Sequence, residues 1–553
     1  MKCSGAEIIV KLLERQGIEI ISGIPGGANL PIYDVLHDSR IHHVLARHEQ
    51  GAGFIAQGMA RSTGRAAVCI ATSGPGATNL LTAIADAKSD SVPIIAITGQ
   101  VPTSMIGLDA FQEVDTYGLT LPITKHNFLV QRAEELFNIL PESFRITESG
   151  RPGPVVIDIP KDIQSEIVEF DRWPEPWKSR PQTSYDPVDI EEVAHMIHES
   201  ERPVICVGGG IVASESSKVL IELAKKNSIP VTSTLMGLGC FPPDDPLFLG
   251  MVGMHGARYT NYIMEETDLL LAFGVRFDDR VTGNAREFCK QASIIHVDVD
   301  HSEIDKIKDT NISIVGDVGS VLVNLNPEIK VDSRPEWNFR VARLKAEFPI
   351  ISPPRDNLLH PLNLIEQVSG LAEPDAIITT DVGQHQMWVA QTYPFRYPRT
   401  FLTSGGLGTM GFGLPAAIGA ALAHPDRQVV CFSGDGSFMM NIQELATMAD
   451  QNLNVTVIVM NNNHLGLVRQ QQELFYNNRV YAAKFYSNPD FAAIAEGFGV
   501  PGYNLKRDSD PLKTLALVLS SPGPNLVNAP INVNANVFPM VPPGSANREM
   551  IGG

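Results

Sequence analysis

Short apolar runs rich in valine and isoleucine alternate with amphipathic helical patterns along most of this chain. In the segment AAVCIATSGPGATNLLTAIADAKSDSVPIIAITG, for example, two such runs flank one helical pattern. Apolar runs of this length joined by helices predict parallel strands with helical crossovers. Two stretches rich in proline and charge, at about residues 164–187 and 326–361, break the alternation. We therefore predict three doubly wound α/β domains with parallel sheets, over roughly residues 1–163, 188–325 and 362–553.

Composition and charge narrow the class of protein further. Apolar residues make up 44% of the chain and charged residues 19%, as in globular proteins. The formal net charge of −19 argues against nucleic acid or an anionic membrane as a partner. No apolar run approaches the roughly 20 residues of a membrane span, and the charged N-terminal helical pattern is unlike a signal or transit peptide. Six cysteines form no CxxC pair, and three lie in AVCIA, VICVG and VVCFS, which predicts buried, reduced thiols in a cytoplasmic protein.

The segment GDGSFMMNIQELATMADQNLNVTVIVMNNN, residues 434–463, combines a glycine turn, a helical pattern and a β-branched run. It follows the apolar run Val429–Phe432, so we predict a strand–helix–strand unit with one helix stripe from Met439 to Ala449. In such a unit the strand ends lie side by side, and Asp435 and Asn462, 27 positions apart, can converge on one ion. The glycines beside Asp435 let a backbone approach a phosphate closely, and the helix after them points free N–H groups at it.

A carboxylate, an amide oxygen and diphosphate oxygens form an all-oxygen site that suits Mg²⁺. The spacing resembles the thiamine-diphosphate signature GDG…NN, and this resemblance implies that Asp435, Asn462 and the His464 carbonyl hold the metal. The alternative is an ordinary Rossmann-type crossover with a glycine turn. The asparagine at this distance from GDG favours the cofactor.

Glu49, in the segment RHEQGAGFIAQGMAR, is a candidate acid–base residue. It follows an apolar run and precedes a helix of small, nearly uncharged residues over Gln50–Arg61. A carboxylate that enters such a setting must be paired or have a perturbed pKa. The alternative is a helix-capping glutamate favoured by the helix dipole. A thiamine site favours catalysis, because the aminopyrimidine of that cofactor needs a carboxyl group at its ring nitrogen for proton transfer.

Several further motifs are ambiguous when each is taken alone. Gly26 and Gly27, in IPGG, and the segment SGPGATN have the composition of strand-to-helix turns. Phe111 and Gln112 lie in GLDAFQEVD, a predicted loop whose mixed composition is typical of loops that line sites. Lys161 follows the strand pattern VVIDIP, and the alternative interpretation is a solvated charge at the end of that strand. The segment GLGTMG, residues 406–411, fits GxGxxG but lacks the strand–helix–strand context with an acidic residue that a dinucleotide site requires.

Taken together, the motifs resemble one family over essentially the whole chain. They include IPGG, RHEQGAGF, SGPGATN, DAFQEVD, TKHNF, SGRPGPVVIDIPKD, GMHG, RFDDR, HVDVD, TTDVGQHQMW, TSGGLGTMGFGLPAAIGAAL, FSGDGSFMMNIQEL and FPMVPPG. This set is similar to acetohydroxyacid synthase large catalytic subunits, in particular the bacterial biosynthetic enzymes that work with a separate regulatory subunit. The resemblance implies a pyrimidine-binding N-terminal domain, a central FAD domain and a C-terminal domain that binds diphosphate and magnesium.

The central domain of the family binds a flavin that looks structural, because the reaction transfers no net electrons. Arg276 matches a position that also grips the substrate carboxylate, which suits a bidentate guanidinium. A plain alternative for RFDDR is a surface ion-pair cluster. The positions that match flavin contacts are Arg151, Gly209, Gly210, Met236, His255, Gly274, Arg276, Asp278, Arg280, Asp298, Glu303 and Asp317.

The family resemblance also assigns residues to thiamine diphosphate and to catalysis. Met410 would wedge the cofactor into its bent shape, and Gln112, Lys161 and the Gly26-Gly27 backbone would orient oxyanions. Phe111 and Gln471 belong to the same catalytic set. Some relatives carry tryptophan at the Gln471 position, and there it favours the larger acceptor. The positions that match contacts of the thiamine cofactor are Glu49, Gly383, Gln384, His385, Gly408, Met410, Gly434, Gly436, Ser437, Leu465 and Gly466.

The implied reaction is decarboxylation of pyruvate and transfer of the two-carbon unit to a second 2-oxoacid. Pyruvate as acceptor gives 2-acetolactate and 2-oxobutyrate gives 2-aceto-2-hydroxybutyrate, in branched-chain amino acid biosynthesis. The cofactors are thiamine diphosphate, Mg²⁺ and FAD. Because Glu49 and Asp435 lie on different domains of similar fold, we expect active sites between two subunits of a homodimer or larger assembly.

Three alternatives stay open. They are a catabolic, flavin-free acetolactate synthase, a pyruvate oxidase-like enzyme, and a non-catalytic thiamine-binding subunit. The segments RFDDR and HVDVD argue against the first, and Glu49, Asp435 and Asn462 together argue against the last. The asparagine-rich stretch over 525–536 departs from the histidine and acidic residues usual in relatives, and we have no physical account of it.

Overall fold

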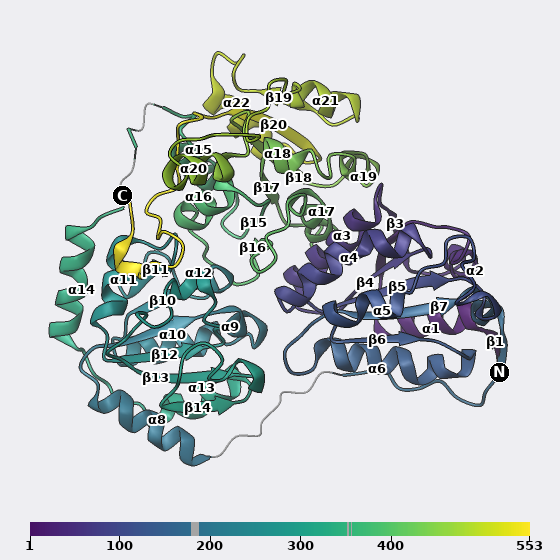
Figure 1. Cartoon of the computed structure of the whole chain (residues 1–553), viewed down its shortest axis with the longest axis horizontal. Coiled ribbons are helices and arrows are strands. Elements are labelled where there is room, and N and C mark those ends of the chain that lie inside the picture. Colours follow the sequence, from purple (N-terminus) through teal and green to yellow (C-terminus); the bar gives the residue numbers. More distant parts are fainter. Residues whose placement is uncertain (179–186, 351–352, 355–356, 553) are drawn as a thin grey trace.

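The computed structural model describes residues 1–178, 187–350, 353–354 and 357–552. These residues form three α/β domains, each built around a six-stranded sheet in which every strand pair is parallel (Figure 1). The predicted architecture of three doubly wound domains is therefore confirmed. Strands such as β4 and β5 are buried along their whole length, because helices cover both faces of the sheet, which explains their unbroken apolar sequences.

The N-terminal sheet has the strand order β3-β2-β4-β5-β7-β6. Its helix α1 starts with a capping box in which Ser4 and Glu7 exchange hydrogen bonds, and it ends at Gly17 with φ +87°. The strands are β2 (Ile20–Gly23), β3 (His42–Leu45), β4 (Ala67–Ala71), β5 (Ile94–Gln100), β6 (His126–Leu129) and β7 (Val155–Pro160). The helices are α1 (Gly5–Gln16), α2 (Leu30–His37), α3 (Glu49–Thr63), α4 (Pro75–Ser89), α5 (Thr116–Thr120), α6 (Leu136–Glu148) and α7 (Lys161–Ser165).

The middle sheet has the order β11-β10-β9-β12-β13-β14. Its strands are β9 (Pro203–Val207), β10 (Val231–Ser233), β11 (Phe248–Met251), β12 (Leu269–Phe273), β13 (Ser293–Asp298) and β14 (Ile312–Val315). Its helices are α8 (Pro187–Glu199), α9 (Gly209–Ala213), α10 (Ser217–Lys226), α11 (Arg258–Glu266), α12 (Asp279–Thr282), α13 (Val318–Glu328) and α14 (Pro335–Glu347).

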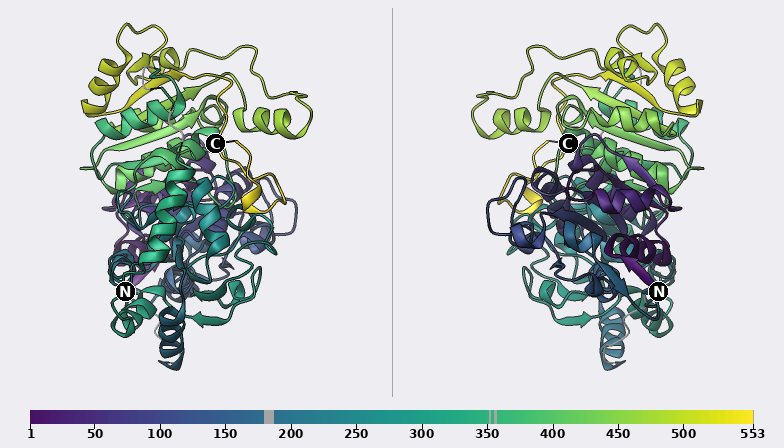
Figure 2. Two further views of the ribbon diagram at one scale, coloured as in Figure 1. Left: turned by 90° about the vertical axis from the view of Figure 1, so that its left-hand side faces the viewer. Right: turned by 90° about the vertical axis from the view of Figure 1, so that its right-hand side faces the viewer.

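The C-terminal sheet has the order β16-β15-β17-β18-β20-β19 and lies above the other two domains in both side views (Figure 2). Its strands are β15 (Ile377–Thr380), β16 (Phe401–Leu402), β17 (Val429–Gly434), β18 (Val455–Asn461), β19 (Gly502–Asn504) and β20 (Asn525–Pro530). Its helices are α15 (Pro361–Leu371), α16 (Gln384–Thr392), α17 (Gly413–Ala423), α18 (Asp435–Phe438), α19 (Glu444–Asp450), α20 (Gly466–Phe475), α21 (Phe491–Gly497) and α22 (Pro511–Ser520).

Both stretches predicted as linkers contain regular structure. Residues 326–361 include α14, whose Trp337 is buried and donates its indole N–H to the Pro203 carbonyl at 3.0 Å. Residues 164–187 include β8 (Ile167–Glu169), which pairs antiparallel with β1 (Lys2–Ser4). The rest of the linker prediction falls partly on residues 179–186, 351–352 and 355–356, which lie outside the described residues.

The helix predicted after the GDG turn is also interrupted. Two short helices, α18 and α19, replace the single stripe from Met439 to Ala449. The break coincides with Asn441, whose side-chain amide donates to the Gly411 carbonyl at 2.7 Å and to Gln50 Oε1 at 3.0 Å. Side-chain hydrogen bonds of this kind compete with a continuous helix.

The N-terminal and C-terminal domains pack through α3 and α17 along a seam that has no room for larger side chains. A Cβ atom at Gly58 would lie 2.1 Å from the Ala416 carbonyl oxygen, and one at Gly419 would lie 2.0 Å from the Ile55 oxygen. Phe54 of α3 and Phe412 beside α17 meet edge to face at 5.3 Å between centroids. One apolar core therefore runs through both domains.

Two further expectations concern cysteines and membranes. Cys69, Cys206 and Cys431 are buried in β4, β9 and β17, and all six cysteines carry free thiols, as predicted. Across the described residues, no helix combines the length and the apolar character needed to span a bilayer.

Candidate functional site

The GDG turn and the asparagine predicted to share a metal meet at the C-terminal edge of the third sheet. Strands β17 and β18 pair in parallel with Gly434 opposite Met460, so Asp435 and Asn462 follow neighbouring strand ends. The Asp435 carboxylate is 2% exposed and accepts a hydrogen bond from Asn488 Nδ2 at 2.8 Å. Asn462 Oδ1 accepts one from the His464 backbone N–H at 3.0 Å.

The electrostatics of this edge suit a hard cation. Burial raises the pKa of Asp435 to about 6, although hydrogen bonds from Asn488 and from backbone groups oppose the shift. A buried carboxylate with no basic side chain bound to it is stabilised by a cation. No group of three or more His, Cys, Asp or Glu side chains among the described residues could hold a metal. The Asp435 carboxylate and the Asn462 amide oxygen can bind Mg²⁺ when phosphate oxygens or water complete its coordination shell.

Glycines line the same edge at points where a side chain would not fit. A Cβ atom at Gly434 would lie 2.9 Å from the His385 ring, one at Gly436 2.7 Å from Leu465 Cδ2, and one at Gly466 2.1 Å from Gln384 Oε1. Helices α16 and α20 begin here at Gln384 and Gly466, so their free N–H groups belong to this edge.

His385 supplies a direct test of whether a ligand fits. Its Nε2 atom is buried and has no hydrogen-bond partner among the described residues. Burial lowers the pKa of His385 to about 3, so the imidazole is neutral. A buried, unpaired ring nitrogen beside a glycine cradle fits a polar ligand group such as a diphosphate. Ser437, also predicted for this ligand, donates its hydroxyl to the Val382 carbonyl at 2.8 Å.

Glu49 is the first residue of α3 and is half-buried. Its carboxylate accepts a hydrogen bond from Asn79 Nδ2 at 2.9 Å. A Cβ atom at Gly76 would lie 3.5 Å from Glu49 Oε1, so the glycine-rich start of α4 approaches this carboxylate closely. Glu49 therefore lies at a helix N-terminus, as the helix-capping interpretation requires, and it also has a fixed orientation, as an acid–base residue requires.

The other predicted catalytic residues of the N-terminal domain lie in the segments that follow its strands. Gly26 packs on Thr72, and a Cβ atom there would lie 2.6 Å from the threonine side chain, whereas Gly27 faces open space. Gln112 has φ +60°, and its Cα would lie 2.9 Å from a Cβ at Gly74. Lys161 is the first residue of α7, directly after β7. The Phe111 side chain is 88% exposed.

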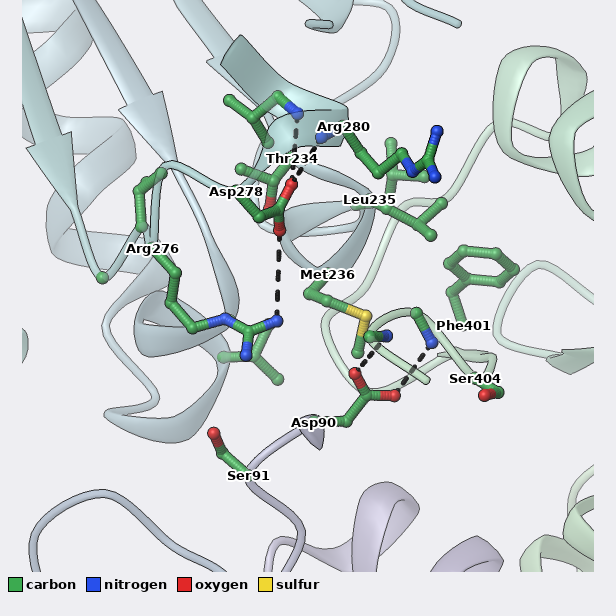
Figure 3. Close-up of a pocket in the computed structure, with 18 of the residues that line it drawn as sticks. Asp90, Ser91, Thr234, Leu235, Met236, Arg276, Asp278, Arg280, Phe401 and Ser404 are labelled. Carbon is green, nitrogen blue, oxygen red and sulfur yellow. Dashed lines mark hydrogen bonds and ion pairs between the residues drawn. The ribbon is translucent and has the colours of Figure 1, made fainter. Parts of the chain in front are cut away.

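A cavity of about 460 Å³ lies where the three domains meet (Figure 3). Of the twelve residues predicted to contact flavin, all except Asp317 line it. Asp317 instead caps α13, with its carboxylate accepting from the Ser320 N–H at 2.8 Å. Gly408 and Gln471 line the same cavity. Glu49 and Asp435 are not among the residues that line it.

The cavity wall has features of a nucleotide cradle. Gly210 and Gly274 touch so closely that a Cβ at Gly210 would lie 2.5 Å from Gly274 Cα, and Gly274 has φ +61°. His255 Nδ1 is buried without a hydrogen-bond partner among the described residues, and burial lowers the His255 pKa to about 4. Arg276 and Arg280 add positive charge to a wall that otherwise includes apolar side chains. The residues present fit a large ligand with an anionic and an apolar part.

Sequence reasoning missed several residues of these sites. Asn79 lies inside the recognised motif SGPGATN, but the motif alone does not reveal its bond to Glu49. Asn488 contacts Asp435 from a segment without a motif. Arg61 and Asp90 line the cavity. In the sequence, however, nothing distinguishes them from ordinary residues of a helical pattern.

Comparisons with known proteins agree along the whole chain. The families described as "Thiamine pyrophosphate enzyme" match with an N-terminal TPP binding domain at residues 3–119, a central domain at 190–325 and a C-terminal TPP binding domain at 381–529. The acetolactate synthase isozyme 1 large subunit of Escherichia coli (strain K12) is 55% identical over 550 residues, covering 99% of this chain and 98% of the relative. A probable acetolactate synthase large subunit of Methanocaldococcus jannaschii is 47% identical over 98% of this chain and 94% of its own length. The chloroplastic acetolactate synthase of Arabidopsis thaliana is 45% identical over 99% of this chain and 84% of its own length.

Proposed function

Because the chain belongs to the acetolactate synthase large subunits, which are thiamine pyrophosphate enzymes, we propose that it decarboxylates pyruvate and joins the two-carbon unit to a second 2-oxoacid. The products are 2-acetolactate from pyruvate and 2-aceto-2-hydroxybutyrate from 2-oxobutyrate, which serve branched-chain amino acid synthesis. The observation that carries the proposal is the edge of the third sheet, where Asp435 and Asn462 follow neighbouring strand ends and the buried His385 Nε2, beside Gly434, has no hydrogen-bond partner among the described residues.

Thiamine diphosphate supplies an electron sink for decarboxylation and for carbon–carbon bond formation when it is bound. Asp435, Asn462 and the His464 carbonyl hold its Mg²⁺. His385 Nε2 and the N-termini of α16 and α20 bind the diphosphate. The remaining contacts come from Gly383, Gln384, Gly408, Met410, Gly434, Gly436, Ser437, Leu465 and Gly466.

Glu49 exchanges a proton with the aminopyrimidine ring nitrogen. The Asn79 amide, which donates to the Glu49 carboxylate at 2.9 Å, fixes the orientation of that carboxylate. A positioned carboxyl group of this kind contributes roughly 10²–10⁴ to the rate.

Arg276 binds the carboxylate of the acceptor. Its Nη1 donates to the Ser89 carbonyl at 2.6 Å and its Nη2 lies 4.0 Å from Asp278, so its position is fixed while donors remain for a substrate. Gln112, Lys161 and the Gly26-Gly27 backbone orient the developing oxyanions. Phe111 and Gln471 contribute apolar and specificity contacts around the substrate.

The three-domain cavity is assigned to FAD. The paired glycines Gly210 and Gly274, the unpaired His255 nitrogen and the arginines support this assignment. The flavin has a structural role here, since the proposed reaction transfers no net electrons.

The active enzyme is a homodimer or a larger assembly in which Glu49 of one copy faces Asp435 of the next. Support comes from apolar residues left uncovered beside the N-terminal edge, with Leu108 70% and Phe111 88% exposed. The chain works with a small regulatory subunit in the cytoplasm and binds neither nucleic acid nor a membrane.

One assay tests the function. The purified chain is incubated with pyruvate, thiamine diphosphate, Mg²⁺ and FAD, and 2-acetolactate is measured after acid conversion to acetoin. We expect product to depend on thiamine diphosphate and Mg²⁺, with a matched Asp435→Ala sample inactive. Bleaching of the flavin by pyruvate would instead indicate an oxidase, activity in a colourless protein would indicate a flavin-free synthase, and inactivity with all cofactors bound would indicate a non-catalytic subunit.

A further inference from the structure

The three residues Ser89, Asp90 and Ser91, at the end of α4, are contacted from all three domains. From the middle domain, Arg276 Nη1 donates to the Ser89 carbonyl at 2.6 Å. Arg151 Nε donates to Ser91 Oγ at 2.8 Å, and its Nη1 lies 2.6 Å from Glu303 of the middle domain. The Asp90 carboxylate points to the C-terminal domain (Figure 3). This turn is therefore a junction beside the flavin cavity.

The Asp90 carboxylate binds two consecutive backbone N–H groups of the C-terminal domain. Oδ2 accepts from the Gly405 N–H at 2.9 Å and Oδ1 accepts from the Gly406 N–H at 2.7 Å. Oδ2 also accepts from Arg61 Nη2 at 2.9 Å. The Asp90 side chain is 0% exposed, although the Gly406 donor lies at the surface. Hydrogen bonds to a charged group in such a setting are among the stronger ones in proteins.

The two glycines are required for this contact. A Cβ atom at Gly406 would lie 2.9 Å from Asp90 Oδ1 and 3.0 Å from Ser89 Cβ. One at Gly405 would lie 2.7 Å from Met236 Sδ, which belongs to the cavity wall. The Gly405-Gly406 turn therefore contacts the Asp90 carboxylate directly and borders the cavity.

The segment that follows is anchored at its other end as well. The Gly411 N–H donates to Asp381 Oδ1 at 2.7 Å. Between these two anchors lie Gly408, which lines the cavity, and Met410, which is assigned to the thiamine cofactor. Asp90 and Asp381 thus hold both ends of one short segment that serves both ligands.

Arg61 is shared with a second buried carboxylate, Asp86. Arg61 Nη2 lies 3.6 Å from Asp86 Oδ1, and the guanidinium lies 5.0 Å from the centre of the Phe412 ring. Burial raises the pKa of Asp86, which favours its neutral form and leaves Asp90 to balance the charge of Arg61.

We propose that Asp90 is a positioning residue that clamps the Gly405-Gly406 turn and thereby couples the flavin cavity to the segment carrying Gly408 and Met410. The coupling to catalysis rests on the proposed function, whereas the clamp itself is a property of the fold. Loss of the clamp lets residues 405–410 move away from the cavity and from the thiamine cofactor together.

The test compares Asp90→Asn with a control, Asp426→Asn. An asparagine at 90 keeps one acceptor but turns its amide toward an N–H donor, whereas Asp426 is an exposed carboxylate on the turn before β17. The first readout is hydrogen exchange of the apo protein over residues 404–411. The second is the Kd of added FAD from quenching of its fluorescence, and the third is kcat and KM for pyruvate at saturating cofactors.

We expect Asp90→Asn to exchange faster over 404–411, to weaken FAD about tenfold or more and to lower kcat, because two hydrogen bonds to a charged group are lost or weakened. Exchange over Val429–Gly434 and the behaviour of Asp426→Asn stay as in the wild type. If Asp90→Asn fails to fold, Gly406→Ala replaces it, since its methyl group opposes the same contact with Asp90 intact.

Two results separate the clamp from the proposed reaction. An active wild type whose Asp90→Asn variant matches it in exchange, FAD affinity and kcat would overturn the clamp and leave the function intact. A wild type that forms no acetolactate, with faster exchange and weaker FAD in Asp90→Asn, would overturn the function and its catalytic coupling while supporting the clamp.

Discussion

The Asn79 side chain donates a hydrogen bond to the Glu49 carboxylate at 2.9 Å, from the first turns of α4 to the first residue of α3. The two residues follow strands β4 and β3 of the same sheet, so the fold brings an amide and a carboxyl group together across 30 positions of sequence. The amide fixes which way the carboxylate points, and the helix N-terminus favours its charge.

Replacing Glu49 with glutamine is expected to keep thiamine diphosphate binding and to slow turnover by roughly two decades or more, as for loss of a positioned acid–base group. Steady-state assays at saturating cofactor measure the change. Asn79→Ala, which leaves the carboxyl group but frees its orientation, is expected to be intermediate. A Glu49→Gln enzyme with near-normal kcat would remove Glu49 from the mechanism.

Asp435→Ala is expected to abolish Mg²⁺-dependent binding of thiamine diphosphate, because a hard cation held by one protein carboxylate depends on it. Titration followed by intrinsic tryptophan fluorescence measures the affinity. Asp426→Ala, an exposed carboxylate on the turn before β17, is the matched control and should bind as the wild type does. Equal affinity in both variants would mean that the metal lies elsewhere.

Gln471→Trp is expected to shift the acceptor preference toward 2-oxobutyrate. Gln471 lines the cavity that also contains Arg276, and an indole there would cover the additional methyl group. One methylene in a complementary pocket changes the preference by about 1–3 kcal/mol, roughly 10–200-fold. Competition of both acceptors in one reaction gives the product ratio. Gln472→Trp is the control, since the Gln472 side chain donates to the Tyr481 carbonyl at 3.0 Å instead.

Asp158 provides a test of pH dependence away from the site. Burial raises its pKa to about 7, although hydrogen bonds from Thr98 Oγ1 at 2.6 Å and Gln100 Nε2 at 2.9 Å oppose the shift. The unfolded value lies near 3.9, so the folded state takes up the proton first as pH falls, and this group's contribution to stability rises from pH 8 to pH 5.

Asp158→Asn removes the buried charge while its amide can donate to the Thr98 hydroxyl and its oxygen can accept from Gln100. We expect its unfolding midpoint at pH 8 to exceed that of the wild type by on the order of 3 °C, and the difference to shrink at pH 5. Thermal scans of both proteins at both pH values measure this. A difference that does not change with pH would show that the carboxyl group titrates normally.

Gly58→Ala is expected to destabilise the protein by roughly 1–3 kcal/mol, because its methyl group would press on the Ala416 backbone and separate α3 from α17. Denaturant or thermal unfolding gives the change. Gly370→Ala in α15 is the control, since no atom of the described residues lies within 4 Å of its Cβ position, and helix propensity predicts a neutral or stabilising effect there. Equal stability of the two variants would contradict tight packing at the seam.

Much of the fold was predictable because its strands are buried on both faces. A strand such as β5 is apolar at nearly every position, which a local pattern reveals directly. Helix α14 was missed because the prolines around it suggested a linker, although Trp337 anchors it to the middle domain. The break between α18 and α19 depends on Asn441 bonds to other segments, which no local pattern contains.

The candidate site was predictable where its chemistry is local. GDG, with an asparagine after the next strand, lies within one strand–helix–strand unit, so spacing alone places Asp435 beside Asn462. Asp90 and Gly405 are 315 positions apart, and their bond depends on how two domains pack. Asp317 caps α13 and does not line the cavity, and its flavin contact stays a prediction from the family resemblance.

The seam between α3 and α17 also limits how the domains can move against one another. Backbone-to-backbone packing and a shared apolar core make the N-terminal and C-terminal domains one rigid body. The middle domain is packed against the C-terminal domain as well, because Met251 shares an apolar cluster with Trp388, and Met254 packs on Met540. We therefore expect any widening of the cavity, for entry of a ligand, to occur at the junction around Ser89, where Arg276 and Arg151 make polar contacts that water can replace.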